Sequence, residues 1–354
     1  MGKARQLTTL PIAGAFIGTI VGAGFATGQE VLQFFTLFGR KSFIGIALAT
    51  ILFCYFGLEI MRISRELKAD SHQELVRYTL GRRLGRLMDW FITLSFLGVL
   101  IVMAAGSGAV TEEQLGLSSL HGSLVVIILA FLTVISGVNN VIRAIAFVVP
   151  FLLIGVLGVT IFSVLHDPLT IQKIVILESL ESPITKNWTF AGLLYVSYNI
   201  LLAVAVLSSL GVEAQNRRCL LWGGVLGGMG LGAGILAINI AIMSSVPAIL
   251  PFQVPMIFLA KGLNSQLALA YGFILLLEIY TTAVSILYGV VARLAHTNIQ
   301  KVFWAGIASL GAIMAAQLGF ARLITTIYPL LGFIGLLFIA SILLTRPREF
   351  LSGL

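Results

Sequence analysis

The sequence predicts an all-α membrane protein with ten transmembrane helices. Of its 354 residues, 58% are hydrophobic and only 10% are charged, whereas a soluble domain carries about 25% charged residues. Apolar runs of about 20 residues, the length of a membrane-crossing helix, recur from end to end. They are too long for the roughly ten-residue alternating strands of a membrane barrel. We therefore expect a single transmembrane domain over residues 1–354.

The apolar runs define the expected spans. The ten ranges are 10–37, 42–62, 87–108, 122–138, 141–165, 189–211, 219–245, 264–294, 302–319 and 323–344. Three prolines interrupt the chain between the seventh and eighth spans, where residues 250–262 are expected to form a short surface helix.

Lysine and arginine set the expected orientation, because cytoplasmic loops carry the excess of basic residues. With a cytoplasmic N-terminus, 16 of the 22 basic residues lie inside. The other six are Arg40, Lys41, Lys173, Lys186, Lys261 and Arg322. We therefore expect both termini in the cytoplasm, with the protein in a bacterial inner or plasma membrane. A secretory signal over residues 3–26 is the alternative, but its cleavage would leave a first span too short to cross.

The same loop placement explains the net charge of +8, so nucleic acid is not an expected partner. The expected partners are the lipid bilayer and a small-molecule solute, without an obligate protein partner.

Ten spans divide into two sets of five, over about 10–165 and about 189–344. Because five is odd, the second set enters from the opposite side, which makes an inverted repeat. No convincing residue-level identity links the two halves, so the repeat is inferred from span count and the positions of breaks. Such transporters bind solute and ion near the membrane midplane, where the first helix of each half is broken.

The stretch IVGAGFATGQEVLQFF, residues 20–35, carries the expected break of the first span. Glycine tolerates non-helical backbone angles. Unwound backbone survives in a membrane only where it lines a cavity or is buried in protein. There, freed amides suit a carboxylate and freed carbonyls suit a cation. The candidate site residues here are Gly22, Ala23, Gly24, Phe25, Gln29 and Glu30. The alternative is that the small residues only allow close helix packing.

The sixth span contains LLYVSYNILLAV and should carry the matching break near Ser197, Tyr198 and Asn199. It has no glycine in that stretch, so interhelical hydrogen bonds and aromatic packing remain an equal alternative. In the seventh span, Gly224, Gly228 and Gly232 recur every four residues, which indicates close packing between helices.

The eighth span reads LLLEIYTTAVSILYG and carries a polar stripe. Its four members at i, i+3, i+4 and i+7 are Glu278, Thr281, Thr282 and Ser285. A carboxylate at mid-membrane costs roughly 2.5–3.5 kcal/mol on insertion scales, so we expect Glu278 to bind a cation or carry a proton. The hydroxyls could instead bond to carbonyls of their own helix.

The first-helix motif IVGAGFATGQEVLQFF closely resembles that of the YkvI-type bacterial membrane proteins, and chain length and span count agree along nearly the whole chain. The resemblance implies the amino acid–polyamine–organocation superfamily and the leucine-transporter fold. It implies alternating access between a bundle of spans 1, 2, 6 and 7 and a scaffold of spans 3, 4, 8 and 9. It also implies a sodium site between first-helix backbone near Gly22 and the hydroxyls of Thr281 and Thr282.

Two departures from that pattern bear on coupling. Glu278 stands where sodium-coupled relatives often have a small residue, and the fifth span lacks the lysine that replaces sodium in some proton-coupled relatives.

The leading interpretation is a secondary active transporter that couples a sodium ion or a proton to symport of a small solute, an amino acid or related compound. The alternative is a membrane receptor of the same fold that binds its ligand without transporting it. No nucleophile–base pair indicates an enzyme, and no organic cofactor is expected.

Overall fold

The computed structural model describes residues 6–69, 71–136 and 141–345, with backbone only for residues 141–153. The regular secondary structure of the described residues is helical, apart from one isolated bridge between Leu7 and Ala214. The helices are α1 (Thr9–Ile20), α2 (Ala23–Thr27), α3 (Gln29–Phe34), α4 (Lys41–Leu67), α5 (His72–Leu115), α6 (Ser119–Ser136), α7 (Val141–His166), α8 (Ile171–Glu178), α9 (Trp188–Glu213), α10 (Arg217–Ser244), α11 (Pro255–Leu263), α12 (Ser265–Leu294), α13 (Asn298–Ala316) and α14 (Phe320–Leu344), with a 3₁₀ turn η1 (Thr36–Phe38).

The chain is a multi-pass membrane protein. Within the described residues, eight helices are long and apolar enough to cross a membrane: α4, α5, α6, α9, α10, α12, α13 and α14. Residues 154–166 of α7 pass the same test together with α8, from which they are bent by 113°. The 12-residue α1 is apolar but too short to cross alone. The eight helices and α7 make up to nine crossings in the described part of the chain. A tenth crossing therefore requires α1, α2 and α3 to act as one interrupted span.

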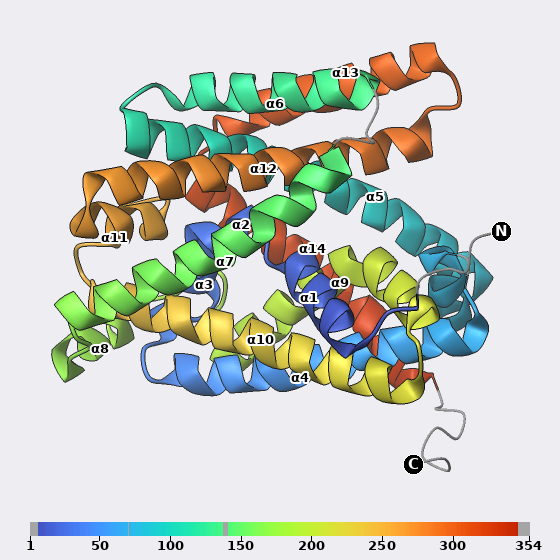
Figure 1. The fold of residues 1–354 in the computed structure, drawn as a ribbon, viewed down its shortest axis with the longest axis horizontal. Helices are drawn as coiled ribbons and strands as arrows, with labels where there is room; N and C mark the ends of the chain where they lie inside the picture. Colours follow the sequence, from blue (N-terminus) through green and yellow to red (C-terminus); the bar gives the residue numbers. More distant parts are fainter. Residues whose placement is uncertain (1–5, 70, 137–140, 346–354) are drawn as a thin grey trace.

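The long helices run side by side in two groups (Figure 1). Helices α5, α6, α12 and α13 pack on one another, while α1, α4, α9 and α10 form the second group. Helix α14 packs on both α9 and α5. This division matches the scaffold and bundle that the family resemblance implies.

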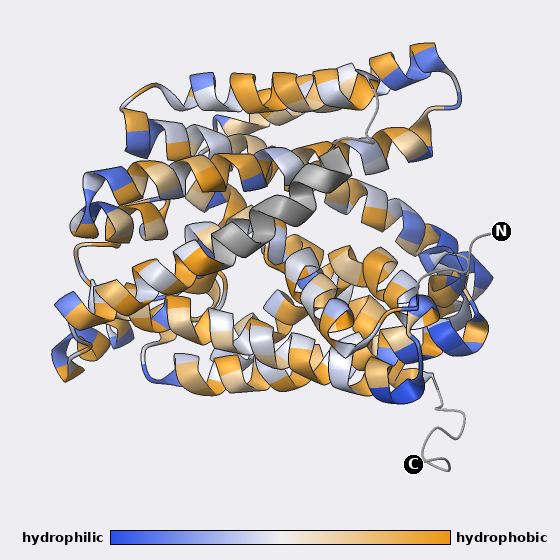
Figure 2. Cartoon of the chain, viewed as in Figure 1, coloured by the Kyte–Doolittle hydropathy of each residue, from blue (hydrophilic) through white to orange (hydrophobic). Residues whose placement is uncertain are grey.

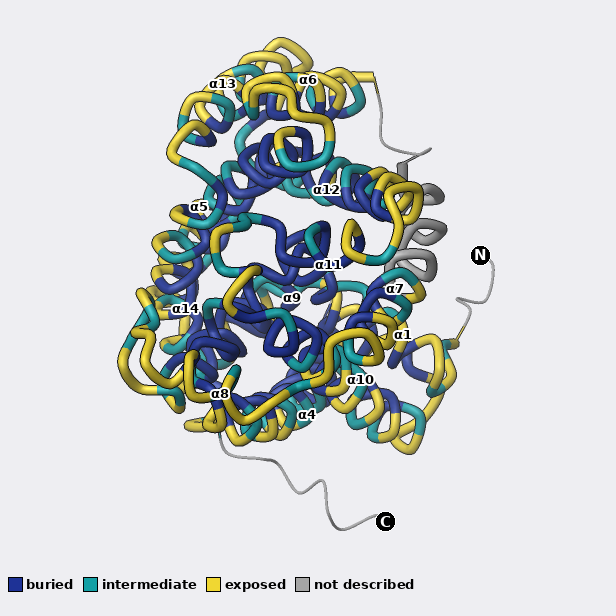
Figure 3. Tube along the Cα trace, turned by 90° about the vertical axis from the view of Figure 1, so that its left-hand side faces the viewer, coloured by how far each residue is buried: buried dark blue, intermediate teal, exposed yellow. Residues whose placement is uncertain are grey.

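Burial separates the central helices from those that face lipid. In the most apolar window of α9, 72% of the residues are buried, against 28% in α13. The dark centre of the tube view reflects this enclosure (Figure 3). Apolar residues cover the sides of the helices, and hydrophilic residues gather at their ends (Figure 2), as expected for a protein surrounded by a bilayer.

The structure differs from the expected spans in two places, the length of the third span and the continuity of the sixth. The third span was expected over 87–108, but α5 covers 44 residues and contains a non-helical Gly81 with φ 75° and ψ 175°. The sixth span, expected to break near residues 197–199, is one continuous helix, α9, which corrects that prediction. The reason is local: this stretch has no glycine or proline to interrupt the hydrogen-bond ladder. The short helix expected over 250–262 is present as α11.

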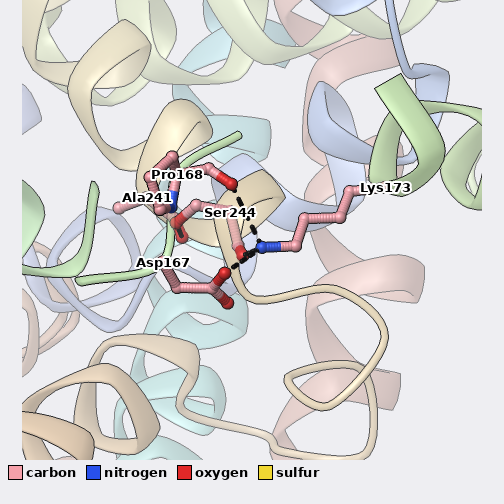
Figure 4. Close-up of polar contacts among 5 residues, drawn as sticks. All are labelled: Asp167, Pro168, Lys173, Ala241 and Ser244. Atoms are coloured by element: carbon pink, nitrogen blue, oxygen red, sulfur yellow. Dashed lines mark hydrogen bonds and ion pairs between the residues drawn. The ribbon is translucent and has the colours of Figure 1, made fainter. Parts of the chain in front are cut away.

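Polar contacts of Lys173 hold helix α8 against the ends of neighbouring helices. Lys173 donates to the carbonyl of Pro168 at 3.2 Å, and it also contacts the Asp167 carboxylate and the carbonyl of Ser244 (Figure 4). Ser244 is the last residue of α10, where a cation is favoured by the helix dipole. Lys173 therefore ties the turn after α7 to the end of α10.

Glycines of α10 allow it to lie directly against α4. A Cβ atom at Gly228 would lie 2.6 Å from the backbone nitrogen of Cys54, and one at Gly232 would lie 2.0 Å from Thr50 Oγ1. At Gly224 the nearest backbone atom is Leu58 Cα, at 3.3 Å. The predicted packing role of these three glycines is confirmed.

We expect Gly228→Ala to lower the free energy of unfolding by about 1–3 kcal/mol, the usual cost of overpacking. The clash is with backbone of α4, which cannot move aside as a side chain can. Thermal melting of the purified protein measures the effect. The matched control is Gly311→Ala in α13, because nothing lies within 4 Å of a Cβ there. Equal melting temperatures for the two variants would contradict this account of the interface.

Candidate functional site

A cavity of about 370 Å³ lies between the interrupted first span, α5, α9, α12 and α14. Its polar lining residues are Thr19, Glu30, Tyr198, Asn199, Glu278, Thr281, Thr282, Ser285 and Tyr328. Its glycine lining comprises Gly18, Gly22 and Gly24, with Ala23 beside them. The structure therefore brings together most of the residues that the sequence singles out in three distant spans.

The first span leaves helical geometry at Val21 and Gly22. Val21 has φ −72° and ψ 87°, and Gly22 is extended with φ −108° and ψ −170°. Helix α2 then begins at Ala23, so Ala23 and Gly24 are helical rather than unwound, which narrows the predicted break. The break interrupts the helical hydrogen-bond ladder at the end of α1: the Ile17 carbonyl still accepts from the Val21 N–H, and the Ile20 carbonyl accepts from the Gly22 N–H at 2.9 Å. Thr19, Ile20 and Gly22 line the cavity.

A second interruption separates α2 from α3. Gly28 has φ 80° and ψ −9°, a left-handed conformation that favours glycine. This interruption was not predicted from the sequence, although the glycine of the Thr-Gly-Gln run is its signal. This turn sets the direction of α3 and thereby places Glu30 at the cavity.

Glu30 is held at the cavity wall by α9. Its Oε2 accepts a hydrogen bond of 2.6 Å from the hydroxyl of Tyr198, and only 5% of the residue is exposed. Its other oxygen, Oε1, lies so close to Gly24 that a Cβ there would be 1.7 Å away. Glycine at position 24 therefore makes room for the carboxylate.

Aromatic rings close the cavity beyond Glu30. Tyr198 stacks on Tyr328 with ring centroids 4.7 Å apart, and Tyr195 lies 5.4 Å from Tyr198. Phe34 and Phe35 lie 5.4 and 5.0 Å from Tyr195. All five are buried. The rings therefore separate the cavity from the end of the molecule at which α9 begins.

The opposite end of the cavity reaches the exposed residues Val206 and Ser285. Both lie nearer the C-terminal ends of α9 and α12. In the orientation predicted from the basic residues, these ends are cytoplasmic.

Helix α12 presents its polar stripe to the cavity. Glu278 is 4% exposed, and its Oε2 has no hydrogen-bond partner among the described residues. The hydroxyl of Thr281 donates to the Glu278 carbonyl at 3.0 Å, and that of Ser285 donates to the Thr281 carbonyl at 2.9 Å. Back-bonding, the open alternative for these hydroxyls, thus applies to Thr281 and Ser285. A hydroxyl that donates in this way still has lone pairs to offer a cation.

Three predicted residues do not line this cavity. Phe25 points to α10, where a Cβ at Gly234 would lie 2.9 Å from its ring. Gln29 is buried, with Oε1 unpartnered. Ser197 donates to the Leu193 carbonyl and faces α14, where a Cβ at Gly335 would meet its backbone at 2.4 Å.

Tyr328 and the apolar lining from α5, including Phe96, Val99 and Met103, were missed. They have no motif that marks them in the sequence, and tertiary packing alone places them at the cavity.

The described residues contain no group of three or more His, Cys, Asp or Glu side chains that could hold a metal ion. The atoms available to a cation are oxygens. They belong to Glu278, Thr281, Thr282 and the backbone at the end of α1. Hard cations prefer such oxygen ligands.

Known structures share the helix arrangement of this chain. MhsT in complex with L-phenylalanine aligns with a TM-score of 0.61 and 16% identity over 97% of this chain and 92% of that one. A substrate-bound outward-open Na⁺-coupled sialic acid symporter gives 0.60 and 14%, over 96% and 79%. The inward-facing conformation of Mhp1 gives 0.56 and 13%, over 92% and 77%. The chain thus has the leucine-transporter fold, which is found in secondary transporters.

Sequence comparison identifies the family. Residues 6–172 match the family described as spore germination protein. The chain is 32% identical to the uncharacterized membrane protein YkvI of Bacillus subtilis (strain 168) over 355 residues, 98% of each chain. It is 28% identical to the uncharacterized protein YyaD of the same strain, over 93% of this chain and 94% of that protein. The chain belongs to the YkvI family of membrane proteins.

Proposed function

We propose that the protein is a secondary active transporter that couples a cation to the symport of a small solute by alternating access. The observation that carries the proposal is the buried Glu278 carboxylate, whose Oε2 has no hydrogen-bond partner among the described residues and which lines the same cavity as the break at Gly22. A buried carboxylate is unfavourable unless it is neutralised or paired. A cation or proton that arrives with the solute meets that requirement.

The topology that suits this function is ten crossings in two inverted sets of five. Helices α1, α2 and α3 form the interrupted first crossing, and α7 forms the fifth. With the basic loops inside, both termini are cytoplasmic and the membrane is the bacterial plasma membrane. The cavity then reaches toward the cytoplasm, while the buried rings of Phe34, Phe35 and Tyr195 close the outer side.

The coupling ion is sodium or a proton. Sodium would be held by Thr281, Thr282 and Glu278 with backbone oxygens near Gly22, whereas a proton would be carried by Glu278 or Glu30. One cation moving down about 100 mV supplies about 2.3 kcal/mol, and a tenfold gradient adds about 1.4 kcal/mol. Together they sustain accumulation of roughly several hundred-fold. The solute is an amino acid or a related compound of similar size.

Uptake of radiolabelled solutes into proteoliposomes tests the proposal. We expect at least one small solute from a panel of amino acids and related amines to enter faster than into protein-free liposomes. A receptor of the same fold, the second candidate, would bind a ligand without uptake. Binding of a solute without any uptake, under sodium and pH gradients applied separately, would contradict transport.

Thr282→Ala is expected to weaken the sodium dependence of uptake by about tenfold, the loss that follows when one favourable ligand is removed. Thr282 lines the cavity, and its hydroxyl has no hydrogen bond within the described part of the chain. Uptake rate against sodium concentration measures the effect. Thr326→Ala is the control, because Thr326 is exposed and back-bonds to Arg322. An unchanged sodium dependence in Thr282→Ala would remove this residue from the ion site.

A further inference from the structure

The cavity is acidic. Two carboxylates, Glu30 and Glu278, line it, and no lysine, arginine or histidine is among the described residues that do so. Both glutamates are at least nine-tenths buried. Two buried carboxylates without basic partners must be protonated or be neutralised by positive charge from whatever binds there.

The two carboxylates have different surroundings. Glu278 Oε2 has no partner, and hydroxyls of its own helix stand beside it. This composition suits a small inorganic cation or a proton. Glu30 lies at the other wall against the stacked rings of Tyr198 and Tyr328, with room for its Oε1 at Gly24. Aromatic faces next to a carboxylate suit an organic ammonium group.

Apolar side chains also line the cavity. They come from α5 and α9 and include Phe96, Met103 and Leu202. A volume of about 370 Å³ fits a small solute with an apolar body. A zwitterionic amino acid would bring a third carboxylate into this space. The lining offers it neutral donors, such as Asn199, Thr282 and Tyr328, but no basic side chain among the described residues to balance its charge.

We infer that the solute is an organic amine without a carboxylate group, bound with its ammonium at Glu30 while the coupling cation occupies the Glu278 side. The inference rests on the proposed function for the second cation, and it narrows the solute to one chemical class. Selection follows from charge: the amine neutralises Glu30, whereas a zwitterion leaves one negative charge uncompensated.

The test uses ligands that share a body and differ in charge. One set is phenethylamine, L-phenylalanine and 3-phenylpropionate, and a second set is pentylamine, L-norleucine and hexanoate. Binding to the purified full-length protein is measured by calorimetry and by the shift in melting temperature. We expect at least one amine to bind about tenfold or more tightly than its amino acid, the factor expected for one charge-assisted contact. The carboxylic acids should not bind.

Glu30→Gln should weaken amine binding by about tenfold or more. Glutamine keeps the size and can still accept from Tyr198, so the melting temperature of the unliganded variant should stay near that of the wild type. Glu112→Gln is the matched control, because Glu112 is exposed and lies outside the cavity. Its amine affinity should be unchanged.

The inference is overturned if an amino acid binds as tightly as its amine, if neither amine binds, or if Glu30→Gln binds the amine as the wild type does. These outcomes are distinct from failure of the transport proposal. An amine that binds but never enters proteoliposomes contradicts transport and leaves the selectivity intact. Uptake of an amino acid in preference to its amine contradicts the inferred selectivity and leaves the transport proposal intact.

Discussion

Gly24→Leu is expected to abolish solute binding while the protein still inserts and folds. A Cβ at this position would lie 1.7 Å from Glu30 Oε1 and 2.6 Å from Cδ, so the carboxylate must leave its position. Displacement breaks the 2.6 Å hydrogen bond from Tyr198, and the leucine side chain enters the cavity. Even Gly24→Ala should lower affinity, because the clash arises at the first side-chain atom. Calorimetry with the best-binding solute measures both variants.

The control for insertion and folding is Gly14→Leu in α1. Gly14 is exposed, and nothing lies within 4 Å of a Cβ there. This variant adds the same side chain to the same span without reaching the cavity, so it should bind like the wild type. Wild-type affinity in Gly24→Leu would show that solute does not approach Glu30 or the backbone beside it.

Glu278→Gln should remove the pH dependence of uptake and reduce gradient-driven accumulation to near equality across the membrane. The carboxylate is buried, has an unpartnered oxygen and supplies the only acidic group on the cavity face of α12 among the described residues. The other ionisable groups that line the cavity are Glu30, Tyr198 and Tyr328, and Glu30 already accepts from Tyr198. Glutamine is nearly isosteric but has no charge to offer a cation and no proton to release.

Uptake into proteoliposomes with sodium and pH gradients imposed separately measures this effect. Glu112→Gln, at an exposed acid outside the cavity, serves again as the matched control. Full uptake by Glu278→Gln with the wild-type pH profile would make Glu278 a structural residue.

Local signals in the sequence led to much of the site. The glycine pair followed by polar residues marked the interruption at Gly22, and four polar residues at helical spacing marked the face of α12. Both rest on local rules, glycine freedom and helical periodicity. They place these residues correctly at the cavity even though the two segments lie some 250 positions apart in the sequence.

The remaining features depend on tertiary packing. The Glu30–Tyr198 hydrogen bond joins residues 168 positions apart, and no local pattern encodes it. Phe25 lies on the short helix α2 and turns toward α10, a contact that no local pattern encodes. The sixth span stays continuous as α9, yet Tyr198 and Asn199 still reach the cavity. An inverted repeat predicts a break in this span, but Tyr198 and Asn199 line the cavity from a continuous helix.

Concentrative uptake tests the central claim most directly. Purified protein in proteoliposomes is given an inward cation gradient, and the internal concentration of a transported amine is compared with the external one. The proposed coupling predicts accumulation well above the external concentration, collapse of that accumulation when an ionophore dissipates the gradient, and no accumulation in Glu278→Gln. Equal concentrations inside and outside, with or without the gradient, would contradict cation-coupled transport by this protein.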